Sequence, residues 1–154
     1  MAYTTIDDPS AYFQTATYSG SGGTGGHAIV NDGNSDLQPD WVWLKQRSYA
    51  SSSRLMDSSR GGNKMIESDT GAAETTYGYI SSFDTDGFTL GYSDNSFDGY
   101  GRNYVGWQWK ANGGTTSSNT DGNTTTTVQV NTTAGFSIVL GSFTGSTKSY
   151  GIGS

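Results

Sequence analysis

Short runs of alternating side chains recur along this chain, and they constrain its fold more than any other feature. Two of them place tryptophan at every second position: DWVWLKQR (40–47) and NYVGWQWKA (103–111). This period is typical of β-strands, whose successive side chains point to opposite faces. Gly, Asn, Asp and Ser separate the runs, as expected of the turns between strands. The pattern predicts about nine short strands.

Helix signals are nearly absent, and the best helix candidate, Met65–Glu74, is short and interrupted by Gly71. Two runs, 54–61 and 63–68, are expected to pair as a hairpin. The chain is therefore predicted to be all-β, an antiparallel β-sandwich of jelly-roll type. The other predicted strands are YFQTATYSG (12–20), GYISSFD (78–84), GFTLGYS (87–93), TTTTVQVNT (124–132) and GFSIVLGSF (135–143).

Both faces of the strand at 40–47 are apolar, with tryptophans on one face and Val42 and Leu44 on the other. A strand of this kind is expected to be central and covered on both sides. Exposed tryptophans that stack on sugars are the alternative, and it stays open. The predicted core residues are Trp41, Trp43, Val105, Trp107 and Trp109.

A polar, low-complexity stretch at 112–127 predicts a surface loop or linker. It divides the chain into a sandwich at 1–111 and final strands at 128–154. Residues 11–22 align without gaps with 136–147, which is either chance similarity or the start of a second copy. A neighbouring chain could complete such a truncated copy with a strand, because an unpaired edge strand favours association.

The formal net charge is −6 and the sequence pI is about 4.4, with no basic run. This acidity disfavours nucleic acid and anionic membrane surfaces as partners. The chain has no cysteine, which excludes disulfides, thiolate metal sites and a cysteine nucleophile. Residues 1–20 lack the apolar segment of a secretory signal, and no apolar run approaches the ~20 residues that span a bilayer. We expect no signal peptide and no membrane insertion.

Several segments occur in an order that carries a family resemblance. They are MAYTTIDDPSAYFQTATYSGSG, LQPDWVWLKQRS, RLMDSSRGGNK, SFDTDGFTLG, YVGWQWKANGG and NTDGNTTTTVQVNTTAGFSIV. Together they resemble a domain of tail-fibre and virion-structural proteins of marine tailed phages, which is itself similar to the laminin-G/concanavalin-like jelly roll. The resemblance covers roughly residues 1–140.

This resemblance implies a non-enzymatic virion protein, a tail-fibre or capsid-decoration component made in the host cytoplasm. Such domains are often repeated in tandem and often proposed to bind host surface glycans. The implied partners are other virion proteins and further copies of this chain, with a trimer among the options. The chain departs from the family where members continue into a further copy.

The motif DTDG, at 84–87, has two interpretations. A calcium loop of the helix–loop–helix type needs a Glu at its twelfth position, and that position is Asn95. A hairpin turn needs only Asp and Gly between two alternating runs, which this segment provides. We predict the turn and no cofactor. Calcium is the minor alternative, with Asp84 and Asp86 as the first ligand candidates and Asp94 and Asp98 as the next.

Catalytic patterns are weak. His27 is the only histidine, and no serine lies in a nucleophile elbow. Glu67 and Glu74 are the only glutamates, and neither lies in the alternating acidic pattern of jelly-roll glucanases. We predict no catalytic residues and a non-enzymatic protein.

The glycine-rich segment 91–104 is the best candidate for sugar recognition, because it combines planar side chains with short hydrogen-bonding groups. The alternative is a solvated hairpin tip. The candidate glycan contacts are Tyr92, Asp94, Asn95, Asp98, Tyr100, Arg102 and Asn103.

Overall fold

The structure is a computed structural model that describes residues 6–23, 26–92, 94–142 and 149–152. Within these residues the chain forms one 3-10 helix and twelve strands, and no α-helix. The elements are η1 (Pro9–Ala11), β1 (Phe13–Ser19), β2 (His27–Ile29), β3 (Trp41–Gln46), β4 (Arg54–Asp57), β5 (Lys64–Glu67), β6 (Thr75–Thr76), β7 (Ile80–Asp84), β8 (Gly87–Leu90), β9 (Asn103–Trp109), β10 (Ser117–Asn119), β11 (Thr126–Asn131) and β12 (Phe136–Leu140).

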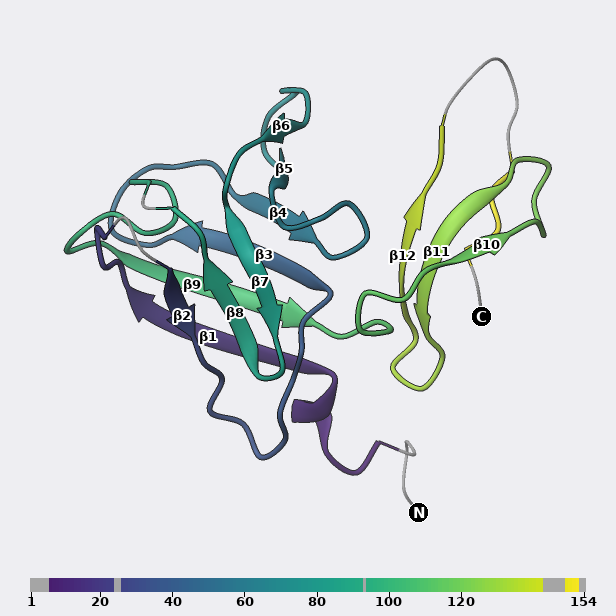
Figure 1. Cartoon of the computed structure of the whole chain (residues 1–154), viewed down its shortest axis with the longest axis horizontal. Helices are drawn as coiled ribbons and strands as arrows, with labels where there is room; N and C mark the ends of the chain where they lie inside the picture. Colours follow the sequence, from purple (N-terminus) through teal and green to yellow (C-terminus); the bar gives the residue numbers. More distant parts are fainter. Residues whose placement is uncertain (1–5, 24–25, 93, 143–148, 153–154) are drawn as a thin grey trace.

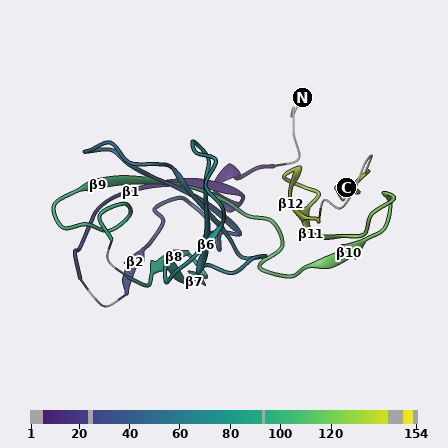
Figure 2. The same cartoon turned by 90° about the horizontal axis from the view of Figure 1, so that it is seen from above.

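Nine of these strands form the two sheets of a sandwich (Figure 1). The larger sheet has the order β1-β9-β3-β4-β5-β6, and the smaller has the order β2-β8-β7. All the strand pairs in both sheets are antiparallel. Figure 2 shows the smaller sheet lying against one face of the larger. The prediction of an all-β antiparallel sandwich is confirmed.

The core lies between the two sheets. The larger sheet contributes Val42 and Leu44, which are fully buried, and the smaller contributes Phe88 and Leu90, which are fully buried as well. Burial of one such side chain stabilises the fold by about 1.5–3 kcal/mol. On β3 the buried residues alternate with more exposed ones, so only one face of this strand enters the core.

The opposite face of the larger sheet carries the tryptophans. Trp43 is 36% exposed, and Trp41, Trp107 and Trp109 are half-buried, whereas Val105 is 9% exposed. Of the five predicted core residues, only Val105 belongs to the buried set, so the prediction is wrong for all four tryptophans. Strand β3 is central in its sheet, as predicted. It is not covered on both sides, because the smaller sheet lies only on the face that carries Val42 and Leu44.

We call this surface the outer aromatic face. Its rings form two cross-strand rows: Phe13 pairs with Trp109, which pairs with Trp41, and in the next row Trp107 pairs with Trp43. The Phe13 and Trp109 ring centroids lie 4.8 Å apart, and those of Trp43 and Trp107 lie 5.7 Å apart. Contacts among the rings thus account for part of their burial. The outer aromatic face consists of Phe13, Trp41, Trp43, Trp107 and Trp109.

The helix candidate Met65–Glu74 is wrong. Its first residues belong to β5, which pairs with β4 in the predicted hairpin and places Arg54 opposite Glu67. A helix of this length with a glycine inside it is too short to be stable by itself. Pairing with β4 satisfies the backbone N–H and C=O groups that a helix would have satisfied, so this segment forms a strand.

A third sheet, β10-β11-β12, stands beside the sandwich (Figure 1). Strand β10 lies inside 112–127, so the prediction of a surface loop or linker is wrong at Ser117–Asn119. The polar sequence of β10 carries no strand signal, and β10 forms by pairing with β11. Strand β12 forms over part of the run 135–143. Residues 143–148, where that run and the repeat 136–147 end, lie outside the described residues.

Buried polar groups fix the third sheet to the sandwich. Asp40 is fully buried and accepts hydrogen bonds from the backbone N–H groups of Ala111 (2.7 Å), Gly113 (2.9 Å) and Gly114 (2.7 Å). Gln129 of β11 is fully buried too, and its Oε1 accepts from the Gly114 N–H at 2.9 Å. All of these hydrogen bonds reach the turn after β9. Asp40 of the sandwich and Gln129 of the third sheet therefore both hold that turn.

Candidate functional site

The segment 91–104 joins β8 to β9 and turns sharply at Asp94. Asp94 Oδ1 accepts a hydrogen bond from the backbone N–H of Ser96 at 2.7 Å. The Asp94 carbonyl accepts from the N–H groups of Phe97 (3.1 Å) and Asp98 (2.7 Å). Phe97 and Asp98 are both 1% exposed, so the chain enters the core directly after the turn, while Asp94 stays at the exposed rim.

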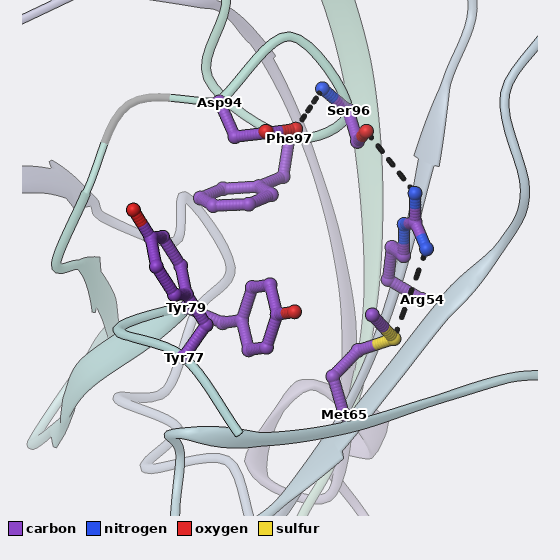
Figure 3. A pocket seen from close by; sticks show the side chains of 7 residues that line it. All are labelled: Arg54, Met65, Tyr77, Tyr79, Asp94, Ser96 and Phe97. Atoms are coloured by element: carbon purple, nitrogen blue, oxygen red, sulfur yellow. Dashed lines mark hydrogen bonds between the residues drawn. The ribbon is translucent and has the colours of Figure 1, made fainter. Parts of the chain in front are cut away.

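A pocket of about 270 Å³ opens beside Asp94 (Figure 3). Its walls come from β4, from β5, from the segment between β6 and β7, and from the loop after β8. We call it the Tyr77 pocket. It is lined by Arg54, Met65, Tyr77, Tyr79, Asp94, Ser96 and Phe97.

Aromatic rings form one side of the Tyr77 pocket. The rings of Tyr79 and Phe97 are 5.4 Å apart at 72°. Tyr77 meets Tyr92 at 5.1 Å and 88°, and these two side chains are 48% and 44% exposed. Edge-to-face pairs of this kind hold rings in fixed orientations. The aromatic wall is therefore anchored in the core at Phe97 and open to solvent at Tyr77.

Polar groups form the other side, where Figure 3 shows Arg54 across the pocket from the rings. Arg54 forms an ion pair with Glu67, and its Nη2 donates to Ser96 Oγ at 3.1 Å. Arg54 Nη1 also lies 3.9 Å from Met65 Sδ. Within the part of the chain that the structure describes, Arg54 Nε is buried and makes no hydrogen bond. One N–H donor of this guanidinium is thus unused.

The Tyr77 pocket contains both hydrogen-bond donors and hydrogen-bond acceptors that a ligand could use. The hydrogen bond with Tyr92, followed by burial and the negative charge of Asp94, raises the pKa of Tyr77 above its ordinary value. The Tyr77 hydroxyl therefore keeps its proton at neutral pH. Because Glu67 compensates the charge of Arg54, the pocket presents both a carboxylate and hydrogen-bond donors, without a large excess of charge.

Two of the seven predicted glycan contacts lie at this pocket: Asp94 lines it and Tyr92 packs on Tyr77. Asp98 does not, and its prediction as a surface contact is wrong. Asp98 Oδ1 accepts from the Ser21 backbone N–H (2.8 Å) and lies 2.6 Å from His27 Nδ1, while Oδ2 accepts from Ser21 Oγ (2.7 Å). Those partners compensate the loss of water around a buried carboxylate.

The other four predicted contacts lie outside the pocket lining. Tyr100 is 85% exposed at the tip of the loop, and Arg102 lies over the ring of Tyr49 at 4.7 Å. The Asn103 side chain accepts a hydrogen bond at 3.1 Å from the Ser19 hydroxyl, and the Asn95 carbonyl accepts one at 2.8 Å from that of Tyr104. The predicted segment therefore does not bring its seven candidate residues together at one site.

Sequence reasoning missed most of the pocket, because its walls come from distant segments. Arg54 and Tyr79 lie in the predicted strands 54–61 and 78–84, and Tyr77 directly precedes the second of these strands. The alternating pair Tyr77 and Tyr79 was the one local signal, since side chains two residues apart share a face. No local pattern places them opposite Arg54.

The residues weighed for catalysis have structural partners. His27 begins β2. The Ser21 hydroxyl donates to Asp98 rather than to the imidazole, whereas a serine nucleophile needs the imidazole as its base. Arg60 donates to Glu74 at 2.9 Å, and this hydrogen bond lowers the pKa of Glu74.

The DTDG motif forms the predicted hairpin turn between β7 and β8, with Asp84 paired to Gly87. Gly87 has φ +100°, and a side chain there would collide with the Ile29 carbonyl oxygen. The two Asp84 oxygens accept from Ser82 Oγ (2.6 Å) and Thr89 Oγ1 (2.7 Å), while Asp86 Oδ1 accepts from the N–H of Leu37 (3.2 Å). Across the described ranges, His, Asp and Glu side chains form no cluster of three that could hold a metal ion.

Comparison with known proteins identifies a family. The model of one family, described as "Domain of unknown function (DUF7483)", matches residues 8–154. No curated protein and no solved structure matches the chain. None of the helical segments in the described parts is long and apolar enough to cross a membrane.

Proposed function

The chain belongs to the DUF7483 family, whose function is unknown, and we propose that it is a non-enzymatic structural protein of a tailed-phage particle. It acts there as a tail-fibre or capsid-decoration component, through surface contact and self-association. The ordered segments that resemble virion-structural domains support this proposal, and so does the β-sandwich. The proposal includes the finer assignment of the sandwich to the jelly-roll type.

The outer aromatic face carries the argument for self-association. Phe13 is 39% exposed and Trp43 is 36% exposed, on adjacent rows of one sheet. Aromatic residues are enriched at protein interfaces and often dominate their binding energy. A sheet face that leaves two large rings exposed and three more half-buried is therefore best explained by a surface that another protein covers.

We infer that the occupant is a second copy of this chain. The chain carries a net charge of −6, so most surfaces of two copies repel each other. Among the outward positions of β1, β9 and β3, the only charged residue is Lys45. Two copies that pack through this face bring no carboxylates of these strands together, and two sheets can stack face to face about 10 Å apart.

Sedimentation velocity over a range of concentrations tests this contact. We expect wild-type chain to associate as concentration rises and Trp43→Ser to raise the dissociation constant at least tenfold. Tyr100→Ser is the matched control, because it also removes an exposed ring, outside the outer aromatic face. Phe13→Ser provides a second test. Wild-type chain that stays monomeric, or equal association of Trp43→Ser and Tyr100→Ser, would contradict the proposed contact.

Location on a particle needs a separate experiment. An antibody raised against this chain is applied to intact phage particles from the source and viewed by electron microscopy. Label on the tail or its fibres supports a role in host contact, and label over the capsid supports decoration. The absence of label from all particles would contradict a virion protein.

The second candidate function is that of a glycan-binding adhesion module that recognises host surface polysaccharide. The Tyr77 pocket favours it, because exposed tyrosine rings lie beside a carboxylate and a guanidinium. Retention of the chain on host cells or immobilised host polysaccharide tests this function. The absence of retention would contradict it and leave the structural role unaffected.

A further inference from the structure

The Tyr77 pocket points to a specific class of ligand, and this inference rests on the glycan-binding candidate function. We propose that the pocket binds one uncharged terminal pyranose unit of a glycan. The argument uses the size of the pocket, its charge balance and the arrangement of its rings, none of which depends on the outer aromatic face.

Size limits the ligand. The volume of about 270 Å³ corresponds to about nine water molecules at liquid density. One sugar ring and a few waters fit into that space, and an oligosaccharide does not. Because Tyr77 and Tyr92 stay about half exposed at the rim, the rest of a glycan can leave toward solvent. The ligand is therefore a terminal or branch residue rather than an internal one.

The charged side chains of the pocket limit the class of ligand further. Asp94 would repel an anion. Arg54, which Ser96 links to Asp94 by hydrogen bonds, would repel a cation, although the ion pair with Glu67 weakens that second effect. A neutral polyol suits both walls, since its hydroxyl groups donate to the carboxylate and accept from the guanidinium. The Arg54 side chain is 15% exposed, so its guanidinium can provide such a donor to a ligand oxygen.

The rings complete the site. A pyranose has an apolar C–H face that buries well against an aromatic ring, and the exposed Tyr77 ring provides such a surface. Its perpendicular contact with Tyr92 holds the ring in place, and Tyr79 is held by Phe97 and by the Thr75 hydroxyl at 2.9 Å. Such a pre-formed wall avoids the entropy cost of ordering the rings on binding.

Saturation-transfer NMR with the full chain tests the proposal. The probes are methyl glycosides of glucose, galactose, mannose, rhamnose and N-acetylglucosamine, with choline and glucuronate as charged comparators. Affinities in the millimolar range are expected for one shallow subsite. We expect saturation transfer to at least one neutral glycoside, which exceeds that to both charged probes.

Variants show whether the saturation-transfer signal arises from the Tyr77 pocket. Tyr77→Leu removes the flat ring and is expected to weaken binding at least tenfold. The matched control Tyr49→Leu removes a ring that is 63% exposed outside the pocket, and it should leave binding unchanged. Asp94→Asn keeps an oxygen that accepts from the Ser96 N–H, so it preserves the turn and is expected to weaken binding by severalfold. It serves as the second variant if Tyr77→Leu does not fold.

Three results would overturn the pocket proposal: no signal from any neutral glycoside, a stronger signal from choline or glucuronate, or equal binding by Tyr77→Leu and Tyr49→Leu. The retention experiment separates this failure from failure of the candidate function. Wild-type and Tyr77→Leu chains that bind host polysaccharide equally would leave glycan binding intact and place it elsewhere. Wild-type chain that is not retained would contradict both.

Discussion

The two faces of the six-stranded sheet present large apolar side chains at alternate positions, and only one of them is a core. On β3, Leu44 is fully buried, while the adjacent Trp43 is 36% exposed. Phe88 and Leu90 of the second sheet cover the first face. On the other face, among the described residues, Phe136 of β12 stacks on Trp109 at 6.2 Å, at one end of the rows. Burial thus follows from the layer that lies over a face, and not from the side chains of the face alone.

Truncation at neighbouring positions of β3 should give the largest contrast. We expect Leu44→Ala to lower the free energy of unfolding by about 3 kcal/mol, because it leaves a cavity in the core. Trp43→Ala removes a larger side chain but should cost only about 1 kcal/mol, mostly from its contact with Trp107. Urea unfolding of dilute protein measures both. A larger loss for Trp43→Ala would contradict the assignment of the two faces.

Two carboxylates of one loop extend the comparison from apolar to polar groups. Asp98→Asn should lower the free energy of unfolding by about 2 kcal/mol, since it weakens charge-assisted bonds to Ser21 and His27. Asp94→Asn should change it by less than about 0.5 kcal/mol, because the amide oxygen can still accept from Ser96. Equal losses in the same urea series would show that the loop does not separate an inner from an outer carboxylate.

Alkaline unfolding sharpens the contrast between an inner and an outer tyrosine. Burial, followed by the charges of Asp98 and Tyr104, raises the pKa of Tyr18 well above its ordinary value of 10.0. Above about pH 10 the unfolded chain releases this proton and the folded chain keeps it, so the free energy of unfolding falls as pH rises. Tyr18→Phe should show a smaller alkaline decline, while Tyr100→Phe keeps the wild-type decline. Identical declines in both variants would contradict this linkage.

The hairpin at 84–87 should give the smallest effect. Because Asp84 and Asp86 already accept hydrogen bonds from the chain itself, we expect calcium or a chelator to leave the melting temperature unchanged. Differential scanning fluorimetry measures this. An increase of several degrees on adding calcium would show a bound ion, since a ligand that binds only the folded state stabilises it.

The strands could be predicted from the sequence because their signals are local. Alternation located β3 and β9, and DTDG located the turn between β7 and β8. The two faces of β3 could not be told apart, because period-2 alternation is the same whichever face a second sheet covers. Strand β10 was missed for a related reason, since Ser117–Asn119 is polar and takes its structure from pairing with β11.

The candidate site was predictable only in part. A polar, glycine-rich loop correctly drew attention to Asp94 and Tyr92, but it gave no sign that Asp98 turns inward to His27. The predicted hairpin of β4 and β5 carries Arg54, but Tyr77 reaches the same pocket through the pairing of β6 with β5, which no sequence pattern indicated. Contacts between distant segments decide which polar residues of a loop meet solvent.

Quenching of tryptophan fluorescence by acrylamide tests the central claim most directly, because all four tryptophans of the chain lie on the outer aromatic face. In dilute native protein we predict strong quenching, which weakens as concentration rises and copies cover the face. The unfolded chain in urea gives the reference for full access. Weak quenching at the lowest concentration would place the tryptophans in a core, and quenching that stays constant while the chain associates would place the contact on another surface.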